Sequence, residues 1–168
     1  LAEQPGNSDT LAGLGEIALR RQQYETAKTF FEQAIESDPD NASAYAGLAS
    51  AFNGLGMVDQ ALASFESALA ANPQNLQARY ALGLLYAQTG DYVHAIPHME
   101  AILEVRPDWD NIRMRLAKAQ EETGAYGLAA DNAVIVLNNS YDDQTALYVA
   151  QLEAKAGRTS SAVNRLEG

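Results

Sequence analysis

Apolar residues recur along this chain at intervals of three and four, in stretches separated by short polar breaks. Within residues 42–75, one apolar stripe runs from Tyr45 to Phe52 and a second runs from Ala61 to Leu69. This spacing places the apolar side chains on one face of an α-helix. The segment therefore predicts two amphipathic helices.

The breaks between the stripes have the residues that end helices. Gly56 follows the first stripe and suits the left-handed residue after a helix end. Pro73 follows the second stripe, and a proline cannot continue a helix and restricts the residue before it. Each unit is therefore predicted to be a helix, a tight turn and a second helix.

The same residue types return every 34 residues along the chain. Small residues in this pattern let neighbouring helices approach closely, and large ones fill the space between units. The positions that share this interval are Pro5, Pro39, Pro73 and Pro107; Gly56, Gly90 and Gly124; Ala27, Ala61, Ala95 and Ala129; Leu14, Leu48, Leu82 and Leu116; and Phe31, Phe65 and Met99.

This period, with its order of aromatic, leucine–small, aromatic, alanine, phenylalanine, alanine and proline positions, resembles the tetratricopeptide repeat. The resemblance implies an all-α fold, a right-handed superhelical solenoid of antiparallel helix pairs in one continuous domain over residues 1–168. The array has about five repeats on this period. The predicted bounds are 1–7 for the tail of a preceding repeat, then 8–41, 42–75, 76–109 and 110–142 for repeats one to four, and 143–168 for an incomplete fifth.

Two features of the sequence depart from a regular array of repeats. The fourth repeat is degenerate, because Tyr141 stands in place of the proline and Gln120 in place of an aromatic residue. The chain begins in what matches the end of a repeat and ends inside a second helix, without the polar capping helix that such arrays need. We expect it to be a segment of a longer array.

Charge and composition narrow the class of partner. The formal net charge is −11 and the pI is about 4.4, so the chain as a whole should repel nucleic acid. No apolar run is long enough to insert in a membrane, and no cysteine is present. These features predict a soluble protein, cytoplasmic or periplasmic, without choosing between the two compartments.

The two histidines raise the question of a metal site. His94 and His98 lie four residues apart and share one face of a predicted second helix. The repeat register places both on or near its outer face, and Glu100 falls off that face. Because a catalytic zinc site needs three protein ligands, we expect no physiological metal here, only adventitious nickel or zinc. Pro97, between the histidines, should bend the helix or mark its first turns.

Other catalytic arrangements are not predicted, because the residue types and spacings that they need are missing. No phosphate-binding glycine loop occurs, and no Ser–His–Asp arrangement can be built from outer-face histidines. The carboxylates of Glu121 and Glu122 are adjacent in sequence and are predicted to be solvated surface. The sequence therefore predicts a protein that is not an enzyme and holds no cofactor.

Members of the family bind extended peptides or partner helices on the concave face lined by their first helices, and the resemblance implies a similar groove here. Tyr80 and Leu84 could equally pack against neighbouring helices, whereas Arg115 and Lys118 suit an acidic ligand group. The principal groove candidates are Asn53, Tyr80, Leu84, Gln88, Met114, Arg115 and Lys118, and the same face includes Glu16, Arg20, Ala46, Ser50, Leu147 and Gln151.

Two specialised family grooves are not matched. The carboxylate clamp of cochaperones needs Lys, Asn and Arg where this chain has Ala12, Glu16, Gly47, Gln77 and Ala81. The asparagine ladder of sugar transferases is replaced by Gly13, Gly47, Ala81 and Arg115. The missing clamp and the excess of arginine over lysine favour a bacterial source by analogy.

The resulting hypothesis is a non-catalytic protein–protein interaction scaffold, an adaptor that binds a peptide or partner helix during assembly of a larger complex. Two alternatives stay open: a targeting arm of a larger enzyme, and a structural module that self-associates. Leu11 and Leu14, expected to be uncovered on the first helix, motivate the second alternative. The chain is thus expected to be a monomer or to associate weakly end to end.

Overall fold

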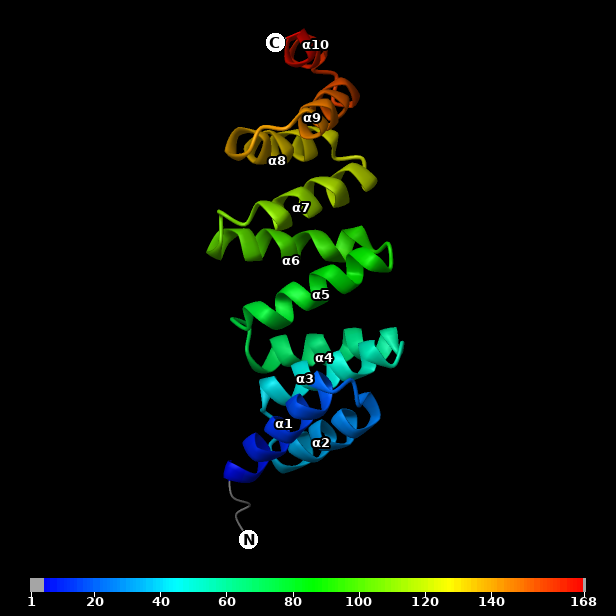
Figure 1. Cartoon of the computed structure of the whole chain (residues 1–168), viewed down its shortest axis with the longest axis vertical. Helices are drawn as coiled ribbons and strands as arrows, with labels where there is room; N and C mark the ends of the chain where they lie inside the picture. Colours follow the sequence, from blue (N-terminus) through cyan, green and yellow to red (C-terminus); the bar gives the residue numbers. More distant parts are fainter. Residues whose placement is uncertain (1–4, 168) are drawn as a thin grey trace. The chain divides into compact units, whose positions relative to one another are not determined.

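Every element of secondary structure in residues 5–167, the range that the computed structural model describes, is an α-helix (Figure 1). The all-α class predicted from the sequence is therefore confirmed. The helices are α1 (Pro5–Arg20), α2 (Tyr24–Ser37), α3 (Ala42–Gly54), α4 (Val58–Ala71), α5 (Leu76–Gln88), α6 (Tyr92–Val105), α7 (Asp110–Glu122), α8 (Tyr126–Asn139), α9 (Asp143–Lys155) and α10 (Thr159–Glu167).

The chain forms two compact units, an N-terminal unit that ends at Leu85 and a C-terminal unit that begins at Tyr86. In the N-terminal unit α1 packs on α2, α2 on α3 and α3 on α4, and α1 also touches α3. In the C-terminal unit α6 packs on α7, α7 on α8, α8 on α9 and α9 on α10. Within α1 to α4 and within α6 to α10, helices that follow one another in sequence are thus neighbours in space, which is the arrangement of a helical repeat.

The predicted core positions are buried in both units. Alanines one repeat apart are fully buried and allow close approach of the helices, while the larger side chains fill the spaces between them. The buried sets are Ala27, Ala61, Ala95 and Ala129, and Phe31, Phe65 and Met99.

Phe31 shows how one large ring holds three helices together. The ring projects from α2 and is fully buried. A Cβ added at Gly47 on α3 would lie 2.2 Å from it, and one added at Gly15 on α1 would lie 2.8 Å from it. The ring therefore occupies the space between α1 and α3 that is open because Gly15 and Gly47 have no side chains.

The two leucines of the first helix that were expected to be uncovered differ from each other. Leu14 is 42% exposed, as expected, whereas its counterparts Leu48, Leu82 and Leu116 are buried. Leu11, also expected to be uncovered, instead packs partly against the N-terminal core. Residues 5–7 form the first turn of α1, and residues 1–4, the rest of the predicted tail of an earlier repeat, lie outside the described residues.

Helix ends follow the turn residues seen in the sequence. Gly56, Gly90, Gly124 and Gly157 all have φ between 75° and 81°, the left-handed conformation that ends a helix at low cost in glycine. Gln22 takes the same role after α1 with φ 58°. The starts of first helices are capped by polar side chains: Asn41 Oδ1 accepts from Ala44 N at 2.9 Å, Asn75 Oδ1 from Ala78 N at 3.0 Å and Asp142 Oδ1 from Thr145 N at 2.8 Å.

In the degenerate fourth repeat, a polar side chain takes the place of the buried aromatic ring. Gln120, which replaces an aromatic residue, is 3% exposed. Its Oε1 accepts a hydrogen bond from Asn132 Nδ2 at 2.9 Å, across from α7 to α8. A buried amide that is hydrogen-bonded costs little, so the repeat keeps its geometry without the ring.

Pro97 lies inside α6, in its second turn, which fits the expectation that it marks the first turns of this helix. Its missing N–H leaves one carbonyl of the preceding turn without its helical partner. None of the described helices has the length and apolar character needed to cross a membrane.

Candidate peptide-binding surfaces

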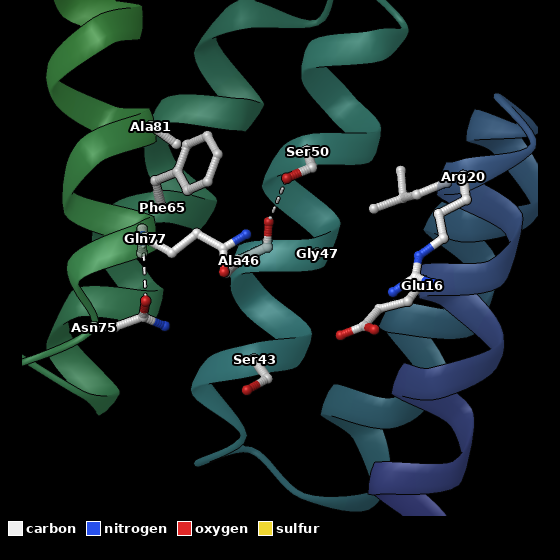
Figure 2. Close-up of a pocket in the computed structure, with 12 residues that line it drawn as sticks. Glu16, Arg20, Ser43, Ala46, Gly47, Ser50, Phe65, Asn75, Gln77 and Ala81 are labelled. Carbon is white, nitrogen blue, oxygen red and sulfur yellow. Dashed lines mark hydrogen bonds between the residues drawn. The ribbon is translucent and has the colours of Figure 1, made fainter. Parts of the chain in front are cut away.

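First helices line a pocket of about 370 Å³ in the N-terminal unit. Figure 2 shows Glu16 and Arg20 of α1 facing α3, with Asn75, just before α5, and Gln77 and Ala81, on α5, beyond it. We call this the N-terminal pocket. The residues that line it are Glu16, Leu19, Arg20, Ser43, Ala46, Gly47, Ser50, Phe65, Asn75, Gln77, Ala78 and Ala81.

The floor of this pocket is shaped by small residues on α3. Gly47 has no side chain, and the Ser50 hydroxyl donates to the Ala46 carbonyl at 2.9 Å along its own helix (Figure 2). Four residues predicted for the binding face, Glu16, Arg20, Ala46 and Ser50, line it. With one acidic and one basic side chain, the pocket offers hydrogen bonds rather than a net charge.

Two adjoining pockets lie between α7 and α9 in the C-terminal unit. The first, about 550 Å³, we call the Arg115 pocket; it is lined by Asn111, Met114, Arg115, Lys118, Glu121, Tyr148 and Gln151. The second, about 430 Å³, we call the Leu147 pocket; it is lined by Met114, Gln144, Thr145, Leu147, Tyr148 and Gln151.

The structure places the seven principal groove candidates in two groups. Met114, Arg115 and Lys118 come together in the Arg115 pocket. The other four lie on α3 and α5 and do not line the N-terminal pocket: Asn53 and Gln88 are exposed, and Tyr80 and Leu84 are half-buried.

Two residues that line the Arg115 pocket, Glu121 and Tyr148, belong to a hydrogen-bonded triad with Lys155. Glu121 Oε1 accepts from Lys155 Nζ at 2.6 Å, and its Oε2 accepts from the Tyr148 hydroxyl at 2.9 Å. Partial burial pushes the pKa of Glu121 upward, but these two hydrogen bonds outweigh burial and hold the pKa below its usual range. Burial, and then the bond to Glu121, raise the pKa of the Tyr148 phenol. The expectation that Glu121 is solvated surface was wrong, since its side chain is only 20% exposed.

Sequence reasoning did not select Asn111, Glu121 or Tyr148 for the binding face. A signal existed for the triad, because Glu121 and Lys155 are opposite charges one repeat length apart. In a helical repeat such residues fall on neighbouring first helices. Tyr148 gave no such signal, because it is 27 residues from Glu121.

The histidines of α6 differ from each other. His94 is exposed, and its Nδ1 lies 2.7 Å from Asp91 Oδ2, a hydrogen bond that lowers the pKa of Asp91. His98 was expected on or near the outer face, but it is half-buried and stacks on Tyr86, with ring centroids 5.9 Å apart. The His94 ring stacks on the same tyrosine at 5.3 Å. Among the residues with described side chains, no group of three His, Cys, Asp or Glu could hold a metal ion.

The chain is built from successive helix pairs, and their first helices line open pockets. It is therefore a helical-repeat protein. Family models described as tetratricopeptide repeat match residues 1–52 and residues 54–112. The chain belongs to the tetratricopeptide repeat family. Among curated proteins none matches its sequence.

Solved structures with the same fold include MamA proteins and YrrB. MamA of strain AMB-1 is 25% identical with a TM-score of 0.81, over 95% of this chain and 88% of MamA. MamA from Desulfovibrio magneticus RS-1 is 15% identical with a TM-score of 0.77, over 96% and 92% of the two chains. The TPR protein YrrB is 20% identical with a TM-score of 0.81, over 94% and 81%. This chain therefore has the fold of a protein-interaction scaffold.

Proposed function

We propose that this protein is a non-catalytic adaptor that binds an extended peptide or a partner helix along its first helices during assembly of a larger complex. The observation that carries the proposal is the pair of adjoining pockets between α7 and α9. They combine partly exposed apolar side chains with amides and cations, and surfaces of mixed character of this kind suit peptide recognition. YrrB, which shares the fold, is described as having an unusual peptide-binding site.

The test is affinity capture from a lysate of the source organism with three single variants beside the wild type. Ser50→Arg fills the N-terminal pocket, and Gln151→Arg fills the two C-terminal pockets. Gln60→Arg adds the same charge at an exposed position on a second helix, α4, and serves as the control.

We expect Gln60→Arg to retain the partners of the wild type and at least one pocket variant to lose them, with helical circular dichroism unchanged in all three. Partners retained by both pocket variants would contradict binding along the first helices.

Self-association is a second candidate, favoured by uncovered apolar side chains on α1 and α10. Leu14 and Ile17 on α1 are 42% and 49% exposed, and Val163 and Leu166 on α10 are 45% and 61% exposed. Exposed apolar side chains that lie together often mark interfaces. Light scattering tests it: a mass that rises with concentration and stays constant in Ile17→Lys supports self-association, and a monomer at every concentration excludes it.

A further inference from the structure

Helix α7 carries positive charge in a strongly acidic chain. The net charge is −11, yet Arg113, Arg115 and Lys118 follow one another within six residues. Arg113 is engaged elsewhere, since its Nη1 donates to Asn132 on α8 at 3.2 Å and its Nη2 donates to the Pro107 carbonyl at 2.7 Å. Arg115 and Lys118 are both exposed and both line the Arg115 pocket.

The carboxylate inside this pocket does not neutralise them. Both oxygens of Glu121 already accept hydrogen bonds, from Lys155 and from Tyr148. Lys118 is near enough to lower the pKa of Glu121, but within the described part of the chain neither Lys118 nor Arg115 forms an ion pair. Glu122, which follows Glu121 at the end of α7, does not line the pocket.

Arg115 is also oriented before any ligand arrives. Its Nε donates to Asn111 Oδ1 at 2.9 Å, one turn earlier on the same helix. This bond fixes the Nε side of the guanidinium group. Among the described residues, the terminal nitrogens Nη1 and Nη2 have no hydrogen-bond partner. A guanidinium in that state can donate two parallel hydrogen bonds to a carboxylate.

An apolar position lies directly beside the cations. The Leu147 pocket shares Met114, Tyr148 and Gln151 with the Arg115 pocket. Leu147 is 49% exposed, and Met114 and the Tyr148 ring are half-buried. A ligand side chain packed there would remove apolar surface from water, and the exposed Gln151 amide between the pockets can pair with a peptide group.

We infer that the α7–α9 surface selects an extended peptide segment in which an Asp or Glu lies next to a large apolar residue. The carboxylate pairs with Arg115 and Lys118, and the apolar side chain enters the Leu147 pocket. Charge complementarity identifies this occupant, because the surface is locally cationic and its one carboxylate is already paired. The inference rests on the proposed function, and it names the class of peptide that this surface takes.

The experiment uses four arrays of immobilised decapeptides with the whole chain as probe. Each array fixes one neighbouring pair: acidic with Leu or Phe, amide with Leu or Phe, acidic with Ala or Ser, and Lys with Leu or Phe. Two charge-matched double variants are compared with the wild type: Arg115→Gln with Lys118→Gln in the pocket, and Arg21→Gln with Arg106→Gln outside it. The arrays are developed at low salt and repeated at high salt.

We expect the wild type to bind the acidic–apolar array about fivefold better than the amide–apolar array, since exposed ion pairs are individually weak. High salt should reduce this ratio because it screens exposed charges. The pocket double variant should lose the preference, and the Arg21, Arg106 variant should keep it. The acidic–small array should bind weakly because nothing fills the Leu147 pocket.

Two results would overturn the inference: equal binding of the acidic–apolar and amide–apolar arrays, or a preference that survives in the pocket double variant. Failure of the proposed function gives a different pattern. In that case no array binds above the Lys–apolar background, and the Gln151→Arg and Ser50→Arg variants lose nothing from the lysate. Peptide binding without acidic preference would leave the proposed function standing and remove only this inference.

Discussion

At the scale of single residues, the turn after α1 contains the one left-handed residue of the described chain that is not glycine. Gln22 has φ 58°, and its register position in later repeats is held by Gly56, Gly90 and Gly124. Left-handed backbone costs a residue with a Cβ about 1–2 kcal/mol. The position was predictable from the sequence, since the repeat interval leads from Gly56 back to Gln22.

Replacing Gln22 with glycine should therefore stabilise the protein. We expect Gln22→Gly to raise the free energy of unfolding by about 0.5–1 kcal/mol, because the relieved strain exceeds the added entropy of the unfolded chain. Urea denaturation followed by circular dichroism measures the change. Gln23→Gly is the control: the neighbouring residue has φ −88°, so glycine there should only destabilise. Equal effects of the two substitutions would contradict this account.

A second residue, Glu121, links stability to pH. Its pKa in the folded protein lies below the usual value, since the bonds from Lys155 and Tyr148 outweigh the effect of burial. Ionised Glu121 therefore stabilises the fold above the unfolded pKa of about 4.3. That contribution is lost as the pH falls through the lower, folded pKa.

Glu121→Gln should accordingly lower the free energy of unfolding by about 0.5–1 kcal/mol at neutral pH, a magnitude limited by the exposure of Lys155. Near pH 3 the wild type and the variant should approach equal stability. Urea titrations across this range give the difference directly. Glu122→Gln removes the adjacent carboxylate, which forms no ion pair within residues 5–167, and should show neither effect. A pH-independent loss in Glu121→Gln would rule out the linkage.

At the scale of helices, α10 is attached to α9 by a partly buried ion pair, in which Glu153 is the buried member. Glu153 is 4% exposed, and both its oxygens accept hydrogen bonds from Arg165, at 3.1 Å from Nε and 2.9 Å from Nη2. Removing one member of such a pair leaves an uncompensated buried charge. Replacing both members with apolar residues is often neutral.

We expect Arg165→Ala to destabilise the docking of α10 by about 3 kcal/mol. Hydrogen exchange followed by mass spectrometry should show faster exchange in α9 and α10 and unchanged exchange in α1 to α4. The double variant Glu153→Leu, Arg165→Leu should restore most of the protection. If Arg165→Ala leaves exchange in α10 unchanged, apolar contacts alone hold this helix.

The helices themselves could be predicted, but the contacts between them could not. A stripe such as Tyr45 to Phe52 identifies a helix and its buried face, and Gly56 and Pro73 mark the breaks. The rotation of a helix is fixed by its stripe only to within about a residue. Contacts such as Tyr148 with Glu121 depend on that rotation, as does the place of Asn53 outside the N-terminal pocket.

At the scale of the whole molecule, the dominant property is a net charge of −11. No Lys or Arg occurs from Thr29 to Ala78, a segment within the N-terminal unit. On α2 the exposed side chains of Glu32 and Glu36 lie one turn apart, a spacing at which like charges repel. High net charge destabilises a compact state by self-repulsion, so this chain should be sensitive to ionic strength.

Raising NaCl from about 20 mM to about 300 mM shortens the screening length from about 20 Å to about 6 Å. We expect the melting temperature to rise by a few degrees, measured by scanning calorimetry. The variant Glu32→Gln, Glu36→Gln should melt higher than the wild type at low salt and gain less from added salt. Glu25→Gln is the control, because Glu25 lies 3.9 Å from Lys28 and its removal relieves no repulsion. A melting temperature that falls with salt would show that attractive pairs, such as Glu121 with Lys155, outweigh the repulsion.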